Sequence, residues 1–301
     1  MVFILIKQIV VMLIMMSIGM VLYKIGQIDE KGIGQLSNLA LYVATPCVVI
    51  QSLAIQFDAN QLKIGIWVIV FFVAILAVSI LIGRFGCGKA DPVGSFAVLF
   101  SNSGFVGIPL ITGIVGQEYV FYVTMTMIVT TVLFWTYGVY IMSGDKNEVS
   151  VKKILTNPNL IAVVVGMCLF FAPIELPYII KQVLAGMANM NTGLGMIILG
   201  ATLGASNISL MITDTRLYKA TLLRLVAVPL VCIPLLMLMP VQFEVRMVMM
   251  IIAAAPAASA TSMFALKYGR DYSYGTGLSI GTTIVSMITM PLVLALAMAI
   301  L

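Results

Sequence analysis

Long apolar runs fill almost the whole chain, and they limit what it can fold into. Of its 301 residues, 62% are hydrophobic and only 9% are charged, too few to give a soluble domain a polar surface. A helix needs about 20 mostly apolar residues to cross a bilayer. Ten runs come close to this length: 2–23, 33–55, 64–84, 92–113, 118–142, 158–174, 179–204, 217–239, 245–267 and 273–300. The sequence therefore predicts an all-α polytopic membrane protein with ten transmembrane helices.

The residue types that the chain lacks exclude most enzymes. It has no histidine, which rules out His-based zinc sites and Ser-His-Asp triads. Its four cysteines are far apart and form no Cys-x-x-Cys pair. All eleven acidic residues lie in predicted loops or at the ends of spans, so neither a proton relay nor an acidic sodium site is expected inside the membrane. We therefore expect no enzymatic activity, no cofactor and no metal.

Lysine and arginine are distributed unevenly between the loops. The loops after spans 1, 3, 5, 7 and 9 hold eleven of them, whereas the loops after spans 2, 4, 6 and 8 hold three. Because basic residues accumulate in cytoplasmic loops, this bias predicts that both termini lie on the outer side of the cell (inner) membrane. It also explains the net charge of +5 without a nucleic-acid partner.

The two halves of the chain, 1–153 and 154–301, align at a constant offset of 153 residues, so that Gly116–Tyr119 falls on Gly269–Tyr272. The matches are few, and chance similarity is the alternative. Each half holds five spans, an odd number, so the second half would be inserted upside down relative to the first. Such inverted repeats are typical of secondary transporters, which bind substrate near the midplane on interrupted helices.

Span four carries an interruption near its middle. It begins with Asp91-Pro92, a favourable helix start, and reaches Asn102 after roughly 16 Å of helix. That depth is about half of a hydrocarbon core roughly 30 Å thick. The small, polar and proline residues around this point form the first group of candidate substrate-binding residues: Ser101, Asn102, Ser103, Gly104, Gly107 and Pro109.

Span nine is interrupted at a similar depth. Glu244 and Pro256 are separated by roughly 18 Å of helix. The second group of candidates follows: Pro256, Ser259, Thr261 and Ser262. A broken helix exposes unpaired N–H groups and a positive dipole end, which favour an anionic ligand. Simple kinks are the alternative, because proline and glycine are common in membrane helices.

Three further residues are candidates for the substrate cavity. Arg224 is the one charge deep inside a span, where it either attracts an anion in the cytoplasmic vestibule or snorkels to the headgroups. Thr45 and Pro46 interrupt span two, where they either line the cavity or belong to close helix packing with the glycine-rich span seven. Glu118 and Asp271 precede spans five and ten and are expected at helix N-termini.

The interruption in span four resembles a known family. The element Asn102-x-x-x-x-Gly107-Ile108-Pro109-Leu110, after an Asp-Pro helix start, is similar to the fourth span of the auxin efflux carrier family. That family includes the plant PIN carriers and bacterial malate and malonate permeases. Two weaker similarities support it over the rest of the chain: Asn157-Pro158, and Pro256 followed by Ala265-Leu266-Lys267-Tyr268.

The resemblance implies that the spans form two domains with different roles. Spans 1, 2, 6 and 7 would form a scaffold, and spans 3–5 and 8–10 a transport domain in which the broken fourth and ninth spans cross. Asn102 would contact the substrate carboxylate, with Pro109 and Pro256 at the crossing. The plant carriers have a second proline where this chain has Thr261, which leaves the shape of the second break open.

Together these features predict a secondary transporter of small organic anions that works by alternating access. A dicarboxylate such as malate or malonate is favoured over an auxin-like carboxylate. A passive anion channel and a sodium-coupled symporter of organic anions are the alternatives. The expected partners are the organic anion and the lipid bilayer, and a homodimer is left open.

Overall fold

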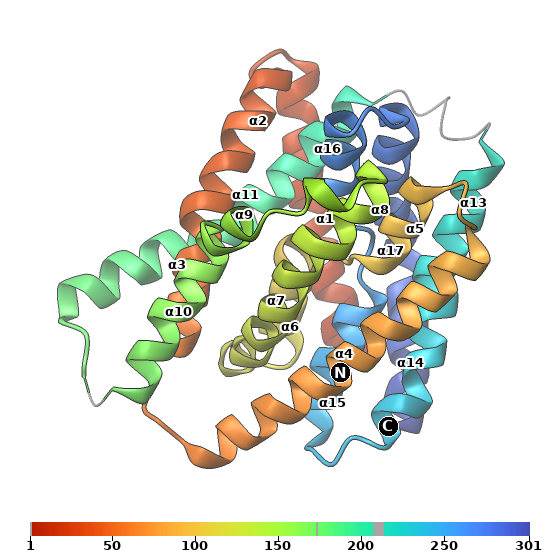
Figure 1. Cartoon of the computed structure of the whole chain (residues 1–301). Helices are drawn as coiled ribbons and strands as arrows, with labels where there is room; N and C mark the ends of the chain where they lie inside the picture. Colours follow the sequence, from red (N-terminus) through yellow and green to blue (C-terminus); the bar gives the residue numbers. More distant parts are fainter. Residues whose placement is uncertain (1, 173, 207–213) are drawn as a thin grey trace.

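The computed structural model describes residues 2–172, 174–206 and 214–301, and this part of the chain is almost entirely helical (Figure 1). Within these described ranges, seven helical stretches are long and apolar enough to cross a membrane, and each coincides with an expected span. In chain order these are α1 (Val2–Lys24), α2 (Glu30–Leu39) with α3 (Thr45–Leu53), α4 (Ala59–Gly86), α7 (Val120–Leu133) with α8 (Val139–Ser143), α11 (Tyr178–Ala205), α13 (Thr215–Leu222) with α14 (Val228–Met237), and α17 (Tyr272–Ile300). The prediction of an all-helical membrane protein is confirmed.

The other three expected spans consist of shorter helices. The sixth is α10 (Pro158–Phe171), which meets the preceding helical segment, including α9 (Val151–Leu155), at a bend of 42°. The fourth and the ninth are each divided in two. Their parts are α5 (Pro92–Leu99) and a π turn (Ser103–Gly107) that runs into α6 (Ile108–Ile114), and α15 (Phe243–Ala254) and α16 (Ala260–Lys267). The helical pattern is therefore interrupted at residues 100–102 and at residues 255–259.

Prolines explain three wide turns within the helices. Three of the four π turns among the described residues are followed, two residues later, by a proline that lacks an N–H group and whose ring would collide with the carbonyl four residues back; the fourth, Phe134–Gly138, has no such proline. A wider turn moves that carbonyl away and lets the helix continue. The turns and prolines are Ala40–Ala44 with Pro46, Ser103–Gly107 with Pro109, and Leu223–Ala227 with Pro229. The expectation that Pro46 interrupts span two is therefore wrong, because Glu30–Leu53 runs as one helical stretch.

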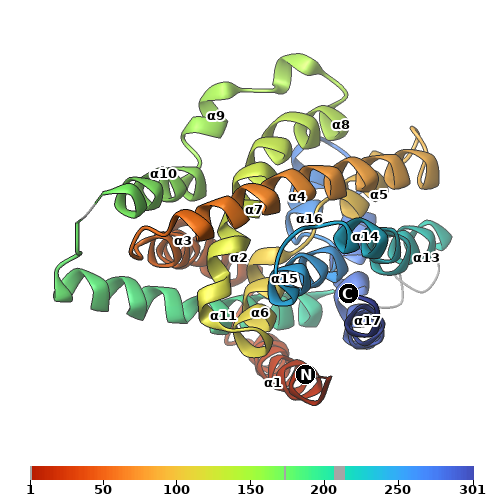
Figure 2. The ribbon, with the colours of Figure 1, turned by 90° about the horizontal axis from the view of Figure 1, so that it is seen from below.

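One side of the molecule is built from α1, α2, α3, α10 and α11. Helix α1 packs along α11, where a side chain on Gly19 or Gly200 would collide with the backbone of the partner helix. Helices α10 and α11 both contact α3. Seen from below, α3, α10 and α11 lie on the opposite side of the molecule from α13, α14 and α17 (Figure 2). Small residues in span seven therefore permit close helix packing, as the sequence suggested.

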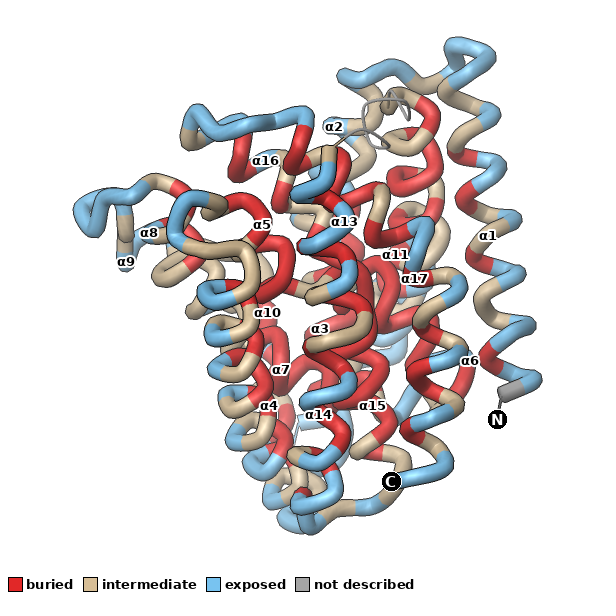
Figure 3. The backbone as a smooth tube through the Cα atoms, turned by 90° about the vertical axis from the view of Figure 1, so that its right-hand side faces the viewer, coloured by how far each residue is buried: buried red, intermediate tan, exposed pale blue. Residues whose placement is uncertain are grey.

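Helix α15 is deeply buried on the other side of the molecule. Its residues 247–254 are all buried, and it contacts α4, α7, α14 and α17. Helices α1 and α4 instead expose large apolar side chains such as Phe3, Ile14 and Val70, as lipid contact requires (Figure 3). The interruption after α15 thus lies within protein, where irregular backbone in a membrane segment is tolerated.

Several of the loops that are rich in lysine and arginine meet at one end of the molecule, which we therefore call the basic end. It includes Asp91, Arg216 and Asp271. Arg216 Nη2 lies 3.0 Å from Asp271 Oδ2, and Tyr274 Oη donates to Asp91 Oδ2 over 2.8 Å. Asp91 and Asp271 also cap α5 and α17 with their side chains.

Glu118 lies away from the basic end, in the short turn that leads into α7. The expected N-terminal positions of Glu118 and Asp271 are confirmed.

Candidate substrate site

The two helix interruptions are hydrogen-bonded to each other, and we call residues 100–102 and 255–259 the junction. The backbone N–H of Asn102 donates to the carbonyl of Pro256 over 2.8 Å, and the N–H of Ala258 donates to the carbonyl of Phe100 over 2.9 Å. Ser101 and Ala257 form an antiparallel bridge between these bonds. Some backbone N–H and C=O groups of each interrupted segment have no hydrogen-bond partner within their own helix. The other segment supplies those partners.

Asn102 ties both parts of the junction together through its side chain. Its Oδ1 accepts the backbone N–H of Phe105 over 3.2 Å and so caps the π turn that leads into α6. Its Nδ2 donates to Ser259 Oγ over 2.9 Å. The residue is only 7% exposed. The sequence identified Asn102 and Ser259 as candidates, and the structure brings them into direct contact.

Hydroxyl groups satisfy the backbone of the second interruption. Thr282 Oγ1 on α17 accepts the N–H of Ala257 over 3.0 Å. The carbonyl of Ala258 accepts from Thr261 Oγ1 over 2.7 Å and from Ser279 Oγ over 3.2 Å. Thr261, which stands where the plant carriers have a proline, therefore forms a hydrogen bond to the backbone of the interruption. Ser262 does the same one residue later, since its hydroxyl donates to the carbonyl of Ser259 over 3.0 Å.

Ser279 and Thr282 were not among the candidates expected from the sequence. A signal was present, because α17 carries four buried hydroxyl residues at helical spacing in an otherwise apolar span: Ser279, Thr282, Thr283 and Ser286. Such spacing places the side chains on one face of a helix. Ser279 and Thr282 of this face bond to the second interruption, while Thr283 and Ser286 lie beside α1 and α6.

Thr45 reaches the first interruption through an asparagine. Thr45 Oγ1 donates to Asn191 Oδ1 over 2.9 Å, and Asn191 Nδ2 donates to the carbonyl of Gly104 over 3.4 Å. A methyl group built on Gly104 would meet no described atom from elsewhere in the chain within 4 Å. The structure therefore leaves space beside Gly104, next to Ser103, which is 7% exposed.

Three further candidates, Pro46, Gly107 and Pro109, lie outside the junction. Pro46 lies one residue after Thr45 and is half-buried. Gly107 ends the π turn and lies against Ser103. Pro109 lies at the start of α6, and its carbonyl accepts a hydrogen bond from the Gln8 side chain of α1 over 3.2 Å. Gly107 and Pro109 thus belong to the helical segment that follows the first interruption, whereas Pro46 belongs to α3.

Arg224 has a different environment from either of those expected. Its side chain is 2% exposed, so it neither snorkels to the headgroups nor projects into a vestibule. It donates four hydrogen bonds to backbone carbonyls of the two interrupted helices. Nε donates to the carbonyl of Ala255 over 2.9 Å, and Nη1 donates to that of Val98 over 3.0 Å. Nη2 donates to the carbonyls of Ile252 and Ala253 over 3.3 and 3.0 Å. Sequence reasoning could not find these acceptors, since they lie 28 to 126 residues away.

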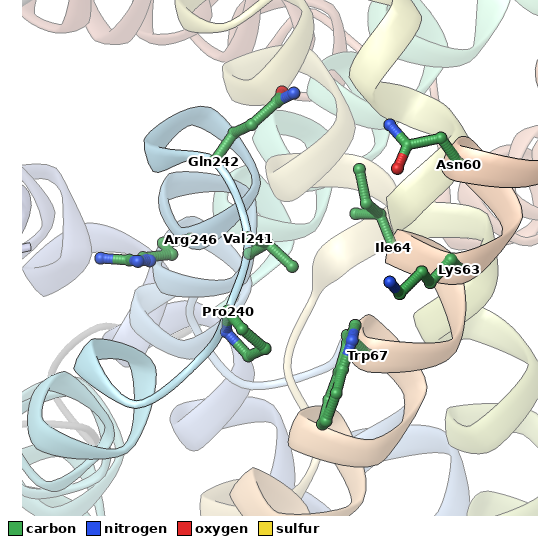
Figure 4. Close-up of a pocket in the computed structure, with 8 residues that line it drawn as sticks. All are labelled: Asn60, Lys63, Ile64, Trp67, Pro240, Val241, Gln242 and Arg246. Atoms are coloured by element: carbon green, nitrogen blue, oxygen red, sulfur yellow. The ribbon is translucent and has the colours of Figure 1, made fainter.

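Two hollows lie toward the ends of the molecule. One of about 580 Å³ at the basic end separates α2 and α11, with Glu30 and Ser206, from α13 and α17, with Leu217 and Tyr274. The other, of about 490 Å³, lies between the start of α4 and the segment that precedes α15 (Figure 4). Residues of the junction line neither of them. The first hollow follows the boundary between the two sides of the molecule.

The fold and the junction define a class: an all-helical membrane protein in which two interrupted helices are joined within the protein. A family model described as "Membrane transport protein" matches residues 4–153 and 146–294. The chain therefore belongs to this family, the auxin efflux carriers, as the element around Asn102 indicated. It is also similar to an uncharacterized transporter of Methanothermobacter thermautotrophicus, with 26% identity over 294 residues that cover 93% of this chain and 94% of the relative.

Proposed function

We propose that this protein is a secondary transporter of small organic anions that works by alternating access, with the substrate bound at the junction. The single observation that carries this proposal is the contact between Asn102 and Ser259, which joins the two interruptions inside the protein. Neutral amide and hydroxyl groups and the N-terminal ends of helices surround this contact. Such groups favour a negative ligand over a cation.

The proposal includes ten membrane spans in two inverted halves, 1–153 and 154–301, whose fourth and ninth spans cross at the junction. Seven spans are long continuous helices, and the interrupted fourth and ninth and the bent sixth complete the count. Gly116 and Gly269, which correspond at the offset of 153, both have positive φ, at 136° and 63°. Both positions favour glycine, although their backbone angles differ, and this supports the repeat. Both termini would lie on the outer side of the cell (inner) membrane, opposite the basic end.

Alternating access requires two bodies that move against each other. Spans 1, 2, 6 and 7 would form the scaffold, and the remaining spans would carry the junction as a transport domain. The hollow of about 580 Å³ between α2 and α11 on one side and α13 and α17 on the other supports this division. It provides a route from the basic end along the boundary between the bodies.

A small carboxylate is the proposed substrate, with dicarboxylates such as malate or malonate preferred over an auxin-like compound. The space beside Gly104 is adjacent to Ser101, Asn102 and Ser103, which offer donors to a carboxylate. Thr45 and Asn191 reach the same point from the scaffold side. A ligand there would contact both bodies.

Uptake of labelled malonate and malate into proteoliposomes tests the proposal. A carrier gives saturable uptake and exchange of internal for external substrate, whereas a channel gives flux that rises linearly with concentration. Asn102→Ala should reduce saturable uptake at least tenfold, and Asn60→Ala, an exposed residue at the start of α4, should not. Normal uptake by a folded Asn102→Ala protein would refute the site. The absence of saturable uptake of any tested carboxylate by the wild-type protein would refute the function.

A further inference from the structure

Arg224 binds the carbonyls that the two interruptions leave without helical partners. In a helix the carbonyl of residue i accepts the N–H of residue i+4. Ile252 has no such partner because residue 256 is a proline, and Ala253 loses its partner because the N–H of Ala257 donates to Thr282. Val98 loses its partner because the N–H of residue 102 donates across the junction. The guanidinium group supplies donors to all three of these carbonyls.

In the part of the chain that the structure describes, Arg224 forms no salt bridge with an acidic residue. No carboxylate lies within 4.0 Å of it among the residues that the structure describes, whose salt bridges involve only Lys181 and Arg216 as cations. The four hydrogen bonds satisfy most of its five N–H donors, yet they leave a full positive charge buried in the protein. A buried charge is costly, and within a membrane span it usually serves the transported species.

Four helix ends meet at the junction, and their partial charges can be added. The C-terminal ends of α5 and α15 each carry about −0.5 elementary charge, and the N-terminal ends of Ser103–Ile114 and α16 each carry about +0.5. Without Arg224 these contributions cancel. With Arg224 bound to the carbonyls of both C-terminal ends, the negative contribution is neutralised. A net charge of about +1 remains, and it is concentrated at the two N-terminal ends.

We propose that Arg224 makes the junction selective for anions and that the group it accommodates carries a single negative charge, as one carboxylate does. Arg224 is a positioning residue, since it acts through the backbone of the two interrupted helices and does not need to touch the ligand. The inference rests on the proposed function for the identity of the ligand, but the sign of the potential at the junction can be measured without any substrate.

Chemical labelling measures that potential. In a background in which the four native cysteines are replaced, Gly104→Cys places a thiol in the open space beside the junction. Two methanethiosulfonate reagents of similar size, one with a sulfonate and one with a trimethylammonium group, react with this thiol. A unit charge roughly 8 Å away at an effective dielectric constant of about 20 changes each rate by on the order of thirtyfold, in opposite directions. Arg224→Met should therefore lower the anionic-to-cationic rate ratio at least tenfold.

Two further variants separate charge from structure. Arg224→Lys keeps the charge with fewer donors and should restore most of the ratio, whereas Arg224→Gln keeps an amide donor without charge and should not. If Arg224→Met does not fold, the labelling rate ratios of Arg224→Lys and Arg224→Gln are compared instead. Arg84→Gln, at an exposed cation on α4, is the matched control and should leave the ratio unchanged. Equal ratios in the Arg, Lys and uncharged variants would overturn the inference.

Ligand binding connects the inference to transport. Malonate and its neutral diamide are titrated into the detergent-purified protein. Arg224→Met should weaken malonate binding by about tenfold to thirtyfold and leave the affinity for the diamide unchanged, whereas a purely structural defect would weaken both equally and count against the inference. If the wild-type protein binds no carboxylate while the labelling ratio still depends on residue 224, the proposed function fails and the electrostatic inference stands.

Discussion

The side-chain amide of Asn102 donates a hydrogen bond to the hydroxyl of Ser259 over 2.9 Å, although the two residues are 157 positions apart. The bond joins the helix interruption at residues 100–102 to the one at residues 255–259. Both residues also organise their own segment, since Asn102 caps the turn that follows it and Ser259 accepts from the hydroxyl of Ser262 through its carbonyl. A change at this pair therefore affects the geometry of both interruptions at once.

Asn102→Asp should separate capping from ligand binding. Aspartate keeps the oxygen that accepts the Phe105 N–H and is an equally good N-cap, so the protein should still fold. A new negative charge at the junction should repel an anionic substrate and reduce carboxylate uptake at least tenfold. Uptake and melting temperature are measured together. Asn60→Asp, at the exposed start of α4, is the control, and undiminished uptake by Asn102→Asp would contradict an anion site.

Thr282→Val should destabilise the second interruption. The substitution keeps the shape of the side chain and removes the acceptor for the N–H of Ala257, which is buried. A buried donor without a partner costs about 1–3 kcal/mol. The melting temperature in detergent should fall by several degrees, whereas Thr289→Val on the same helix, where the hydroxyl hydrogen bond is exposed, should have a much smaller effect. Equal effects of the two substitutions would show that the hydroxyl of Thr282 is not needed.

Gly200→Ala should weaken the packing of α11 on α1. A methyl group there would collide with the backbone carbonyl of Met16, and neither helix can move aside without losing other contacts. The expected loss is about 1–3 kcal/mol, as for other overpacked positions. Gly186→Ala on the same helix meets no atom within 4 Å and should be neutral or slightly stabilising. Thermal unfolding of the two variants side by side would detect the difference, and its absence would argue against close packing at Gly200.

Tyr274→Phe should loosen the basic end. The change removes one hydroxyl that donates to Asp91 Oδ2 over 2.8 Å and so links the start of α17 to the start of α5. The bond goes to a charged group, for which a loss of about 1.5–3 kcal/mol is typical, reduced here by partial exposure to solvent. Tyr272→Phe, half-exposed two residues earlier, is the control. A Tyr274→Phe protein that unfolds at the wild-type temperature would contradict this link.

The sequence predicted the helices well because the signals for them are local. Span seven was expected at 179–204 and is Tyr178–Ala205, and span ten was expected at 273–300 and is Tyr272–Ile300. Hydrophobic length fixes such helices, and Asp271 marks the start of span ten as Asp91 marks the start of span four. The prediction failed at Pro46, where sequence alone did not show that a π turn accommodates a proline without ending the helix.

The candidate site was only partly predictable. Asn102 and Ser259 stood out as polar residues within apolar runs, which sequence can show. The partners Ser279 and Thr282 were visible as a hydroxyl face on span ten, but nothing in the chain order assigned that face to span nine. The role of Arg224 was ambiguous because it depends on hydrogen bonds to backbone carbonyls. Every residue has such a carbonyl, so the sequence does not show which ones Arg224 binds.

The sequence by itself determined where this chain is helical, where two of its helices are interrupted and which polar groups lie at those points, since each depends on residues within one or two turns. Only the tertiary structure decided that the two interruptions bond to each other and that Arg224 binds the carbonyls of both. The physical reason is that these contacts join groups 28 to 157 residues apart. Their partners are brought together by packing of the whole bundle and not by any local pattern.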